Sequence, residues 1–371
     1  MSDLARRIAQ RIRREGPVPL DTYWNLALYD RREGYYTSHM PFGRTGDFIT
    51  APEVSQMFGE LLGAWMVAAW HGLGTPAPFV FAEIGPGRGT LMADMLRTVR
   101  QIDPAFLRAA RITLVEVSDR LAEVQRTTLE RFDLPVARVR TLAELEAGPL
   151  LLVGNELFDA LAIRQFVHDG EGWQERRITV ADDESFAFTA CPLHPEDRSL
   201  IEDLSGALPA PAPGTILELA PARWRLAQAT ADRLRTSGGA ALFIDYGHPA
   251  PAYGDTLQAL RGHQTAEPLN DPGQADLTSH VEFGTLARIF AAAGLAVAPL
   301  AEQGQFLFDL GLRERASTLG TGQSKAEQAA IVAAAERLAG TGPGQMGRIF
   351  KVLAAATRPL PLPPFPAALH D

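Results

Sequence analysis

From residue 79 onward the sequence alternates short apolar runs with segments of helical periodicity, and this alternation constrains the fold more than any other feature. Apolar runs occupy residues 79–84, 111–117 and 150–153, and the stretches 90–101 and 119–132 place apolar residues at helical spacing. Continuously apolar strands separated by helices are typical of a parallel sheet that is covered on both faces. The sequence therefore predicts an α/β fold with a doubly wound sheet.

Other segments predict additions to this sheet. Residues 162–167 and 173–180 have the pattern of a hairpin, so we expect an insertion at about residues 161–214. The sheet is then expected to resume with a strand at residues 215–219 and to end with a strand at 348–353.

The ends of the chain differ from the middle. The first 14 residues are arginine-rich, with Leu4, Ile8 and Ile12 at helical spacing, which suits either a mitochondrial presequence or a structural first helix. Ser2 as a helix cap, followed by a stop at Gly16, favours the structural helix. We expect a helical segment over residues 1–75, the sheet domain over 76–357, and a proline-rich tail over 358–371 that cannot continue a sheet.

Composition excludes several classes of function. The formal charge of −9 and the low proportion of basic residues argue against a protein that binds nucleic acid through phosphate contacts. Cys191 is the single cysteine, and no cysteine and histidine cluster has the spacing of a zinc site, so we predict no metal. The longest apolar run, residues 61–70, is about half the length of a membrane span.

The segment EIGPGRGT (83–90) joins the first strand to a helix and is the sharpest motif in the chain. Gly85, Gly87 and Gly89 allow a ligand to approach the backbone, and the helix N-terminus offers free amide donors, although a plain strand–helix turn has the same composition. A nicotinamide fingerprint requires a third glycine one residue later, where this chain has Thr90. The motif therefore argues against a dinucleotide.

Two carboxylates indicate what this loop binds. Glu83 precedes the loop, where it would repel a pyrophosphate but attract a cofactor that carries an ammonium and a sulfonium. Glu116 ends the next strand, where an acid typically binds ribose hydroxyls. Together they predict a site for S-adenosylmethionine.

A third acidic segment, NELFDA (155–160), follows the fourth strand and would face the transferred methyl group. Methyl transfer from a sulfonium depends mainly on positioning and charge control. Glu156 and Asp159 are the residue types that bind a guanidinium, and Asn155 would lie beside the cofactor. The alternative is that Asp159 caps the next segment and Glu156 is solvated.

Two later strand ends supply candidate bases. Asp245 and His248 follow a strand that would end at the same edge of the sheet, although a turn at Gly247 explains them equally well. His280 precedes a helix and is a further candidate base, while Thr278 or Ser279 can simply cap that helix.

These motifs, in this order, resemble the MidA family of methyltransferases, which includes the mitochondrial complex I assembly factor with protein arginine methyltransferase activity. The resemblance covers nearly the whole chain: it begins with GYY (34–36) and GDFITAPEVS (46–55) and continues through the glycine loop and NELFDAL (155–161). DLTSHV (276–281) and FKVL (350–353) complete the pattern.

The resemblance implies a seven-stranded, mostly parallel Rossmann-like sheet of the class I methyltransferases, with a helical cap and an insertion after the fourth strand. It also implies S-adenosylmethionine as cofactor and a protein arginine as acceptor. Asp47, Thr50 and Glu53 lie in the segment that the resemblance places in the lid, near the methionine end of the cofactor.

Three functions remain open from the sequence. The first is a protein arginine methyltransferase that assists assembly of a respiratory NADH dehydrogenase, with a subunit of that complex as the candidate substrate. The second is a small-molecule methyltransferase that uses Asp245, His248 or His280 as base, and the third is an assembly chaperone that binds the cofactor without turnover. We expect no nucleic-acid partner, consider a homodimer possible, and expect the bacterial cytoplasm, or the mitochondrial matrix if the chain is eukaryotic.

Overall fold

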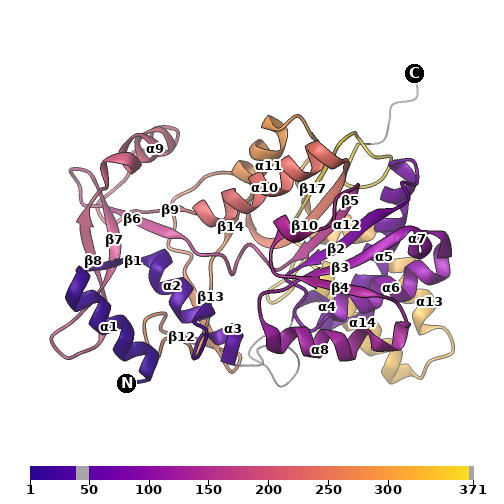
Figure 1. Ribbon diagram of the computed structural model, residues 1–371, viewed down its shortest axis with the longest axis horizontal. Coiled ribbons are helices and arrows are strands. Elements are labelled where there is room, and N and C mark those ends of the chain that lie inside the picture. The colour runs from indigo at the N-terminus through magenta and orange to yellow at the C-terminus, as the bar shows by residue number, and fades with distance from the viewer. Residues whose placement is uncertain (39–49, 367–371) are drawn as a thin grey trace.

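The computed structural model describes residues 1–38 and 50–366, which form a large lobe and a smaller lobe (Figure 1). The large lobe is built on one mixed sheet. Its main strands, in spatial order, are β15 (Ala296–Val297), β17 (Phe350–Ala356), β10 (Gly239–His248), β5 (Leu150–Asn155), β2 (Phe79–Ile84), β3 (Ala110–Val115) and β4 (Val136–Val139). Two short strands, β14 (Val281–Glu282) and β16 (Ala301–Glu302), pair with β10 and β17. The predicted Rossmann-like sheet is confirmed, although the described residues contain nine strands in it rather than seven.

The order of the strands determines where a ligand can bind. Strands β10, β5, β2, β3 and β4 are parallel, and β17 runs antiparallel to β10. The chain passes from β2 to β3 and β4 on one side, and then crosses to β5 and β10 on the other. Because ligands bind beyond the carboxyl ends of the strands where the order reverses, the expected crevice lies between Ile84 of β2 and Asn155 of β5.

Helices cover both faces of this sheet, and each face has its own apolar core. Residues such as Trp65 and Phe81 belong to the core of one face, and Phe243 and Phe290 to that of the other. The first face carries α5 (Gln56–Gly72), α6 (Thr90–Ile102), α7 (Pro104–Ala109), α12 (Gln303–Asp309), α13 (Leu312–Gly320) and α14 (Lys325–Ala339), and the second carries α10 (Pro221–Ser237) and α11 (Phe283–Ala292). Helix α8 (Asp119–Leu129) connects β3 to β4, with the short helices η1 (Glu130–Phe132) and η2 (Leu142–Glu144) after it.

The smaller lobe is assembled from three separate stretches of the chain, which share a core that includes Ile8, Trp24, Ile163 and Leu277. The first stretch supplies α1 (Asp3–Glu15), β1 (Val18–Pro19), α2 (Leu20–Tyr29) and α3 (Tyr35–Ser38). The second supplies β6 (Arg164–His168), β7 (Trp173–Val180), β8 (Phe186–Pro192), α9 (Pro195–Gly206) and β9 (Ile216–Leu219), and the third supplies β11 (Gln258–Arg261), β12 (Gln264–Ala266) and β13 (Asp276–Thr278).

One sequence-based expectation about the sheet is wrong. The strand at residues 215–219 does not return to the large sheet, because β9 pairs with β6 in the smaller lobe. Its burial alternates along the strand, with Leu217 and Leu219 inside, whereas β2 and β5 are buried throughout. Alternation of this kind marks a strand with one covered face, which does not suit the centre of a parallel sheet.

The described residues among the first 75 divide between the two lobes. The arginine-rich start is α1, capped by the Ser2 side chain and buried along Leu4, Ile8 and Ile12, as a structural helix requires. Helix α4 (Ala51–Val54) and α5 pack on the large lobe instead. In the part of the chain that the structure describes, no helix combines the length and apolar character needed to cross a membrane.

The described part of the proline-rich tail, residues 358–366, returns to pack on α5. Leu360 is 1% exposed, and the indole nitrogen of Trp65 donates a hydrogen bond to the carbonyl of Pro363 at 2.6 Å. The tail therefore closes one edge of the core on this face of the sheet.

Leu360→Ala is expected to lower the free energy of unfolding by about 2–5 kcal/mol, because it removes a fully buried side chain and leaves a cavity beside α5. The same substitution at Leu200, which is 39% exposed, is the matched control and should have a much smaller effect. Denaturant unfolding followed by circular dichroism measures both. Equal effects at the two positions would show that the tail does not stabilise the core.

Candidate functional site

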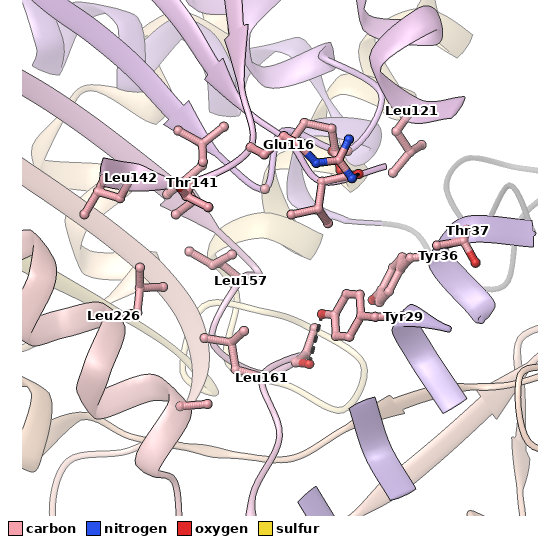
Figure 2. A pocket seen from close by; sticks show the side chains of 18 of the residues that line it. Tyr29, Tyr36, Thr37, Glu116, Leu121, Thr141, Leu142, Leu157, Leu161 and Leu226 are labelled. Atoms are coloured by element: carbon pink, nitrogen blue, oxygen red, sulfur yellow. Dashed lines mark hydrogen bonds between the residues drawn. The ribbon is translucent and has the colours of Figure 1, made fainter. Parts of the chain in front are cut away.

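A cavity of about 620 Å³ lies between the two lobes, beyond the carboxyl ends of β2, β3 and β5 (Figure 2). Gly85, Glu116 and Leu157 line it from the large lobe, and Tyr29 and Tyr36 line it from the smaller lobe. Its volume is within the range of pockets that bind small molecules. The expected crevice at the switch point is therefore a real cavity with walls from both lobes.

The glycine loop approaches this cavity in a backbone conformation that side chains disfavour. Gly85, Gly87 and Gly89 have φ angles of +68°, +50° and +79°. A Cβ atom on Gly85 would lie 2.9 Å from Cδ1 of Leu157, on the loop after β5. Glycine is needed there both for the turn and for the close contact with the next strand end.

Glu83 lies beneath the loop, 2% exposed, and its Oε2 atom has no hydrogen-bond partner. Burial raises its pKa well above the usual value, and the charge of Glu116 adds to the effect. An unpartnered buried acceptor is costly unless a ligand supplies the donor. The position therefore suits a cationic hydrogen-bond donor.

Glu116 lines the 620 Å³ cavity and is fixed by two hydrogen bonds. It accepts one from the Ser118 backbone amide at 2.7 Å and one from the Gln125 side chain at 2.9 Å. Gln125 also donates to the carbonyl of Gly87 at 2.8 Å, so it links the glycine loop to the acid. Sequence analysis did not identify Gln125, because its position inside a helix gives no sign of this role. Burial also raises the pKa of Glu116.

The NELFDA segment forms a tight turn after β5, with Glu156 in the left-handed region at φ +49°. Oε1 of Glu156 accepts hydrogen bonds from the Ala51 backbone amide and from the Asn155 side chain, both at 3.0 Å. Burial raises the pKa of Glu156 to about 8, and the charge of Asp159 contributes. Oδ1 of Asn155 is buried without a partner.

Glu156 also lines a second cavity, of about 50 Å³, which adjoins the glycine loop. Glu83 and Asn155 line this small cavity as well, with Thr50 and Glu53 on its other side. Glu53 accepts a hydrogen bond from the Thr90 hydroxyl at 2.7 Å, so the segment after residue 50 is closed over the start of α6. Asp47, expected in the same lid, lies outside the described residues.

Asp245 has a different position from the one expected of a base. It is fully buried, and Oδ2 accepts hydrogen bonds from the backbone amides of Leu157, Phe158 and Asp159 at 2.8–3.1 Å. Oδ1 accepts another from the Tyr246 amide. Because both oxygens are occupied and the residue lines neither cavity, the geometry supports a positioning role for Asp245.

Arg223, which the sequence did not indicate, is buried beside Asp159 and contacts its backbone carbonyl. Arg223 extends from α10 and is 2% exposed. Its guanidinium donates to the carbonyls of Asp159 and Ser279 at 3.3 Å and to that of His280 at 2.6 Å. Burial raises the pKa of Asp159 to about 6 against the opposing attraction of Arg223, and Oδ1 of Asp159 has no partner.

His280 is not brought together with Glu156. It lines a separate cavity of about 260 Å³, together with His248, and its ring meets Tyr246 edge to face at 5.6 Å. Burial and the neighbouring His248 lower its pKa. The structure therefore gathers Glu83, Asn155 and Glu156 around the small cavity and leaves the histidines elsewhere.

Comparison with known proteins shows to which family the chain belongs. Residues 61–300 match the family described as "Putative S-adenosyl-L-methionine-dependent methyltransferase". The chain belongs to this family. It is 33% identical to the mitochondrial protein arginine methyltransferase NDUFAF7 of Mus musculus, in an alignment that covers 86% of this chain and 76% of the relative. It is 35% identical to the Drosophila melanogaster homolog, in an alignment that covers 95% of this chain and 84% of the relative.

Solved structures agree with this membership. A COG1565 superfamily protein of Burkholderia thailandensis bound to S-adenosyl-homocysteine aligns with a TM-score of 0.81 at 26% identity, covering 95% of this chain and 91% of that protein. The native crystal structure of a COG1565 superfamily protein from the same organism aligns equally well, at 27% identity. The methyltransferase is thus a MidA-like, class I, S-adenosylmethionine-dependent enzyme, as the sequence motifs predicted.

The residues of this methyltransferase fit the cofactor of its family. Two buried acceptor atoms without partners belong to residues that line the small cavity, namely Oε2 of Glu83 and Oδ1 of Asn155. S-adenosylmethionine carries amino groups and hydroxyls that can donate to such atoms, and its ammonium and sulfonium suit the nearby carboxylates. The glycine loop leaves the backbone open to it on the same side.

Asp245→Asn is expected to lower the free energy of unfolding by about 1–3 kcal/mol. The asparagine amide keeps one acceptor oxygen, but its nitrogen then faces either the three turn amides or the Tyr246 amide. The substitution also removes the interaction between the Asp245 carboxyl group and the buried Arg223 guanidinium. Asp203→Asn, at an exposed position, is the control. Chemical denaturation measures both, and an unchanged Asp245→Asn variant would mean that the carboxylate does not hold the turn.

Without ligand, the protein is expected to lose stability as the pH rises from 6 to 8. Glu156 keeps its proton up to about pH 8 when folded but would release it near pH 4.5 when unfolded, so the folded state binds more protons between these values. Glu156→Gln should reduce this slope, whereas Glu171→Gln, at an exposed position, should not. Thermal midpoints measured at intervals of half a pH unit test this, and parallel curves for the wild type and Glu156→Gln would contradict it.

Proposed function

We propose that this methyltransferase transfers a methyl group to the side chain of an arginine in a protein. The observation that carries the proposal is the position of Glu156, which lines both the small cavity beside the glycine loop and the larger cavity that opens to the smaller lobe. A carboxylate there can contact a cofactor on one side and an acceptor on the other. The arginine methyltransferase names of the mouse and fly relatives support the same acceptor.

In this proposal the cofactor supplies a methyl group on a sulfonium. Glu83 and Asn155 would hold its ammonium through their unpartnered oxygen atoms. Glu116, which Ser118 and Gln125 hold in place, would bind the ribose hydroxyls. The lid residues Thr50 and Glu53 would close over the methionine end.

Glu156 would bind a terminal nitrogen of the acceptor guanidinium, orient it, and take up the proton that this nitrogen loses. Asp159, behind it and more deeply buried, would strengthen the negative potential that holds the guanidinium. In the free protein, burial favours the protonated form of Glu156, and a cationic acceptor would shift it to the carboxylate. Catalysis would then depend on positioning and on charge compensation rather than on a strong base.

The geometry gives less support to a small-molecule methyltransferase that uses the other candidate bases. Both oxygens of Asp245 are occupied by backbone amides, and His248 and His280 line the separate 260 Å³ cavity. A chaperone without turnover would not need a carboxylate at the junction of the two cavities. A role in assembling respiratory NADH dehydrogenase, a bacterial cytoplasmic location and a homodimer remain predictions from the family resemblance.

To test the function, the protein would be incubated with labelled S-adenosylmethionine and the subunits of a respiratory NADH dehydrogenase, and modified residues located by mass spectrometry. Glu156→Gln is expected to lower kcat/KM at least about 100-fold, because the amide cannot compensate the guanidinium charge or take its proton. Asp159→Asn should have a smaller effect in the same direction, and Glu171→Gln is the control. If the double variant Glu156→Gln, Asp159→Asn methylates the arginine at the wild-type rate, the proposal is contradicted.

Calorimetry separates cofactor binding from methyl transfer. Glu116→Ala should weaken S-adenosylmethionine binding about 10-fold or more, since it removes a charged hydrogen-bond acceptor that lines the cavity. Glu156→Gln should change this affinity far less than it changes turnover.

A further inference from the structure

The wall of the large cavity that faces the cofactor residues carries two aromatic rings, Tyr29 and Tyr36 (Figure 2). Tyr29 at the end of α2 and Tyr36 in α3 extend from the smaller lobe toward the cavity, opposite Glu116 and Leu157. The two rings stack, with centroids 5.6 Å apart and an angle of 23° between their planes. Neither tyrosine belongs to the glycine loop or to the NELFDA turn, and neither has a part in the function proposed above.

Hydrogen bonds fix both rings in place. The Tyr29 hydroxyl donates to the carbonyl of Ala160, the last residue of the NELFDA segment, at 3.2 Å. The Tyr36 hydroxyl donates to Oδ1 of Asp276 at 2.9 Å, and the Tyr36 carbonyl accepts from the Ser118 hydroxyl at 3.1 Å. Because the rings are already ordered, a ligand that packs on them would lose little affinity to side-chain ordering.

The electrostatic surroundings of the rings favour a cation. Burial raises the pKa of both phenols, and the nearby carboxylates of Asp276 and Asp159 raise them further, so the rings stay neutral in a negative field. Glu116 and Glu156 line the same cavity. Two arginines also line the cavity: Arg140 is engaged by Asp119 and by the carbonyl of Val117, and Arg31 is exposed at the surface.

We propose that Tyr29 and Tyr36 form the acceptor subsite of the enzyme and select a guanidinium over an ammonium. The proposal deepens the function stated above and rests on it. A guanidinium is planar, weakly hydrated and stacks on aromatic rings, whereas an ammonium is compact and strongly hydrated. The tyrosine wall would hold the plane of the guanidinium while Glu156, on the opposite lobe, binds the nitrogen that accepts the methyl group.

The test compares leucine and phenylalanine substitutions at each tyrosine, using an arginine-containing peptide found to be a substrate. Tyr29→Leu and Tyr36→Leu are each expected to raise KM for the peptide about 5- to 30-fold, with kcat changed less, because the ring contact binds substrate and transition state alike. Tyr29→Phe and Tyr36→Phe keep the ring and should stay within about 3-fold of the wild type. Tyr253→Leu, in the 260 Å³ cavity, is the matched control.

Affinity for S-adenosylmethionine, measured by calorimetry, serves as the check on folding and should be the same in all variants. An unchanged KM in both leucine variants would overturn the inference, and so would leucine variants that lose cofactor affinity instead. An equal loss in the leucine and phenylalanine variants would also overturn it, because the hydroxyls and not the rings would then matter.

A binding experiment decides the inference even if no arginine is methylated. The protein with S-adenosylhomocysteine bound would be titrated with N-acetylarginine amide, N-acetyllysine amide and N-acetylcitrulline amide. Preference for the arginine compound, lost in Tyr29→Leu and Tyr36→Leu, supports the subsite; equal binding of the three compounds overturns it. Absence of arginine methylation with this preference intact would count against the proposed function alone.

Discussion

The site depends on one carboxylate that does not line it. Asp245, at the end of β10, accepts the backbone amides of three successive residues, Leu157 to Asp159, on one oxygen atom. Backbone amides in a tight turn have no helical or sheet partner, and a carboxyl oxygen is an acceptor that can satisfy several of them at once. With the turn held in this way, Glu156 can keep its left-handed backbone and face both cavities.

Arg223 extends the same arrangement to the smaller lobe. Its guanidinium joins the carbonyl of Asp159 to those of Ser279 and His280, which follow β13, so one buried cation connects the NELFDA turn with the third stretch of that lobe. The indole of Trp24 donates to the Ala160 carbonyl at 3.0 Å and adds a link to the first stretch. The tyrosine wall and the turn are thus one hydrogen-bonded unit, which brings residues far apart in the sequence to the same cavity.

The sequence predicted the features that depend on neighbouring residues and missed those that depend on residues far apart in the chain. The glycine loop, Glu83, Glu116 and the NELFDA turn were located correctly at strand ends, because a strand–turn–helix pattern is local and the edge where parallel strands end is fixed by the fold. The sequence identified Asp245 as an acid at a strand end but not its partners, which are backbone amides almost 90 residues away. Arg223, Gln125 and Tyr29 have no local signal, because their contacts exist only after the chain has folded. Tyr36 belongs to the GYY motif (34–36), but the motif alone gave it no role in the site. The error at β9 had a local signal, the alternation of buried and exposed residues, that favoured an antiparallel strand.

The burial of several acids in one crevice couples ligand binding to the release of protons. Glu83, Glu116, Glu156 and Asp159 all have raised pKa values, and burial is the first cause in each case. If all four were ionised without ligand, their mutual repulsion in a poorly solvated crevice would destabilise the fold. Protons can compensate this charge in the free protein, and the ammonium and sulfonium of the cofactor, followed by the acceptor cation, can replace those protons on binding. A site that exchanges protons for cations in this way favours positively charged ligands over neutral ones of the same shape, because a neutral ligand leaves the carboxylates no replacement for the protons.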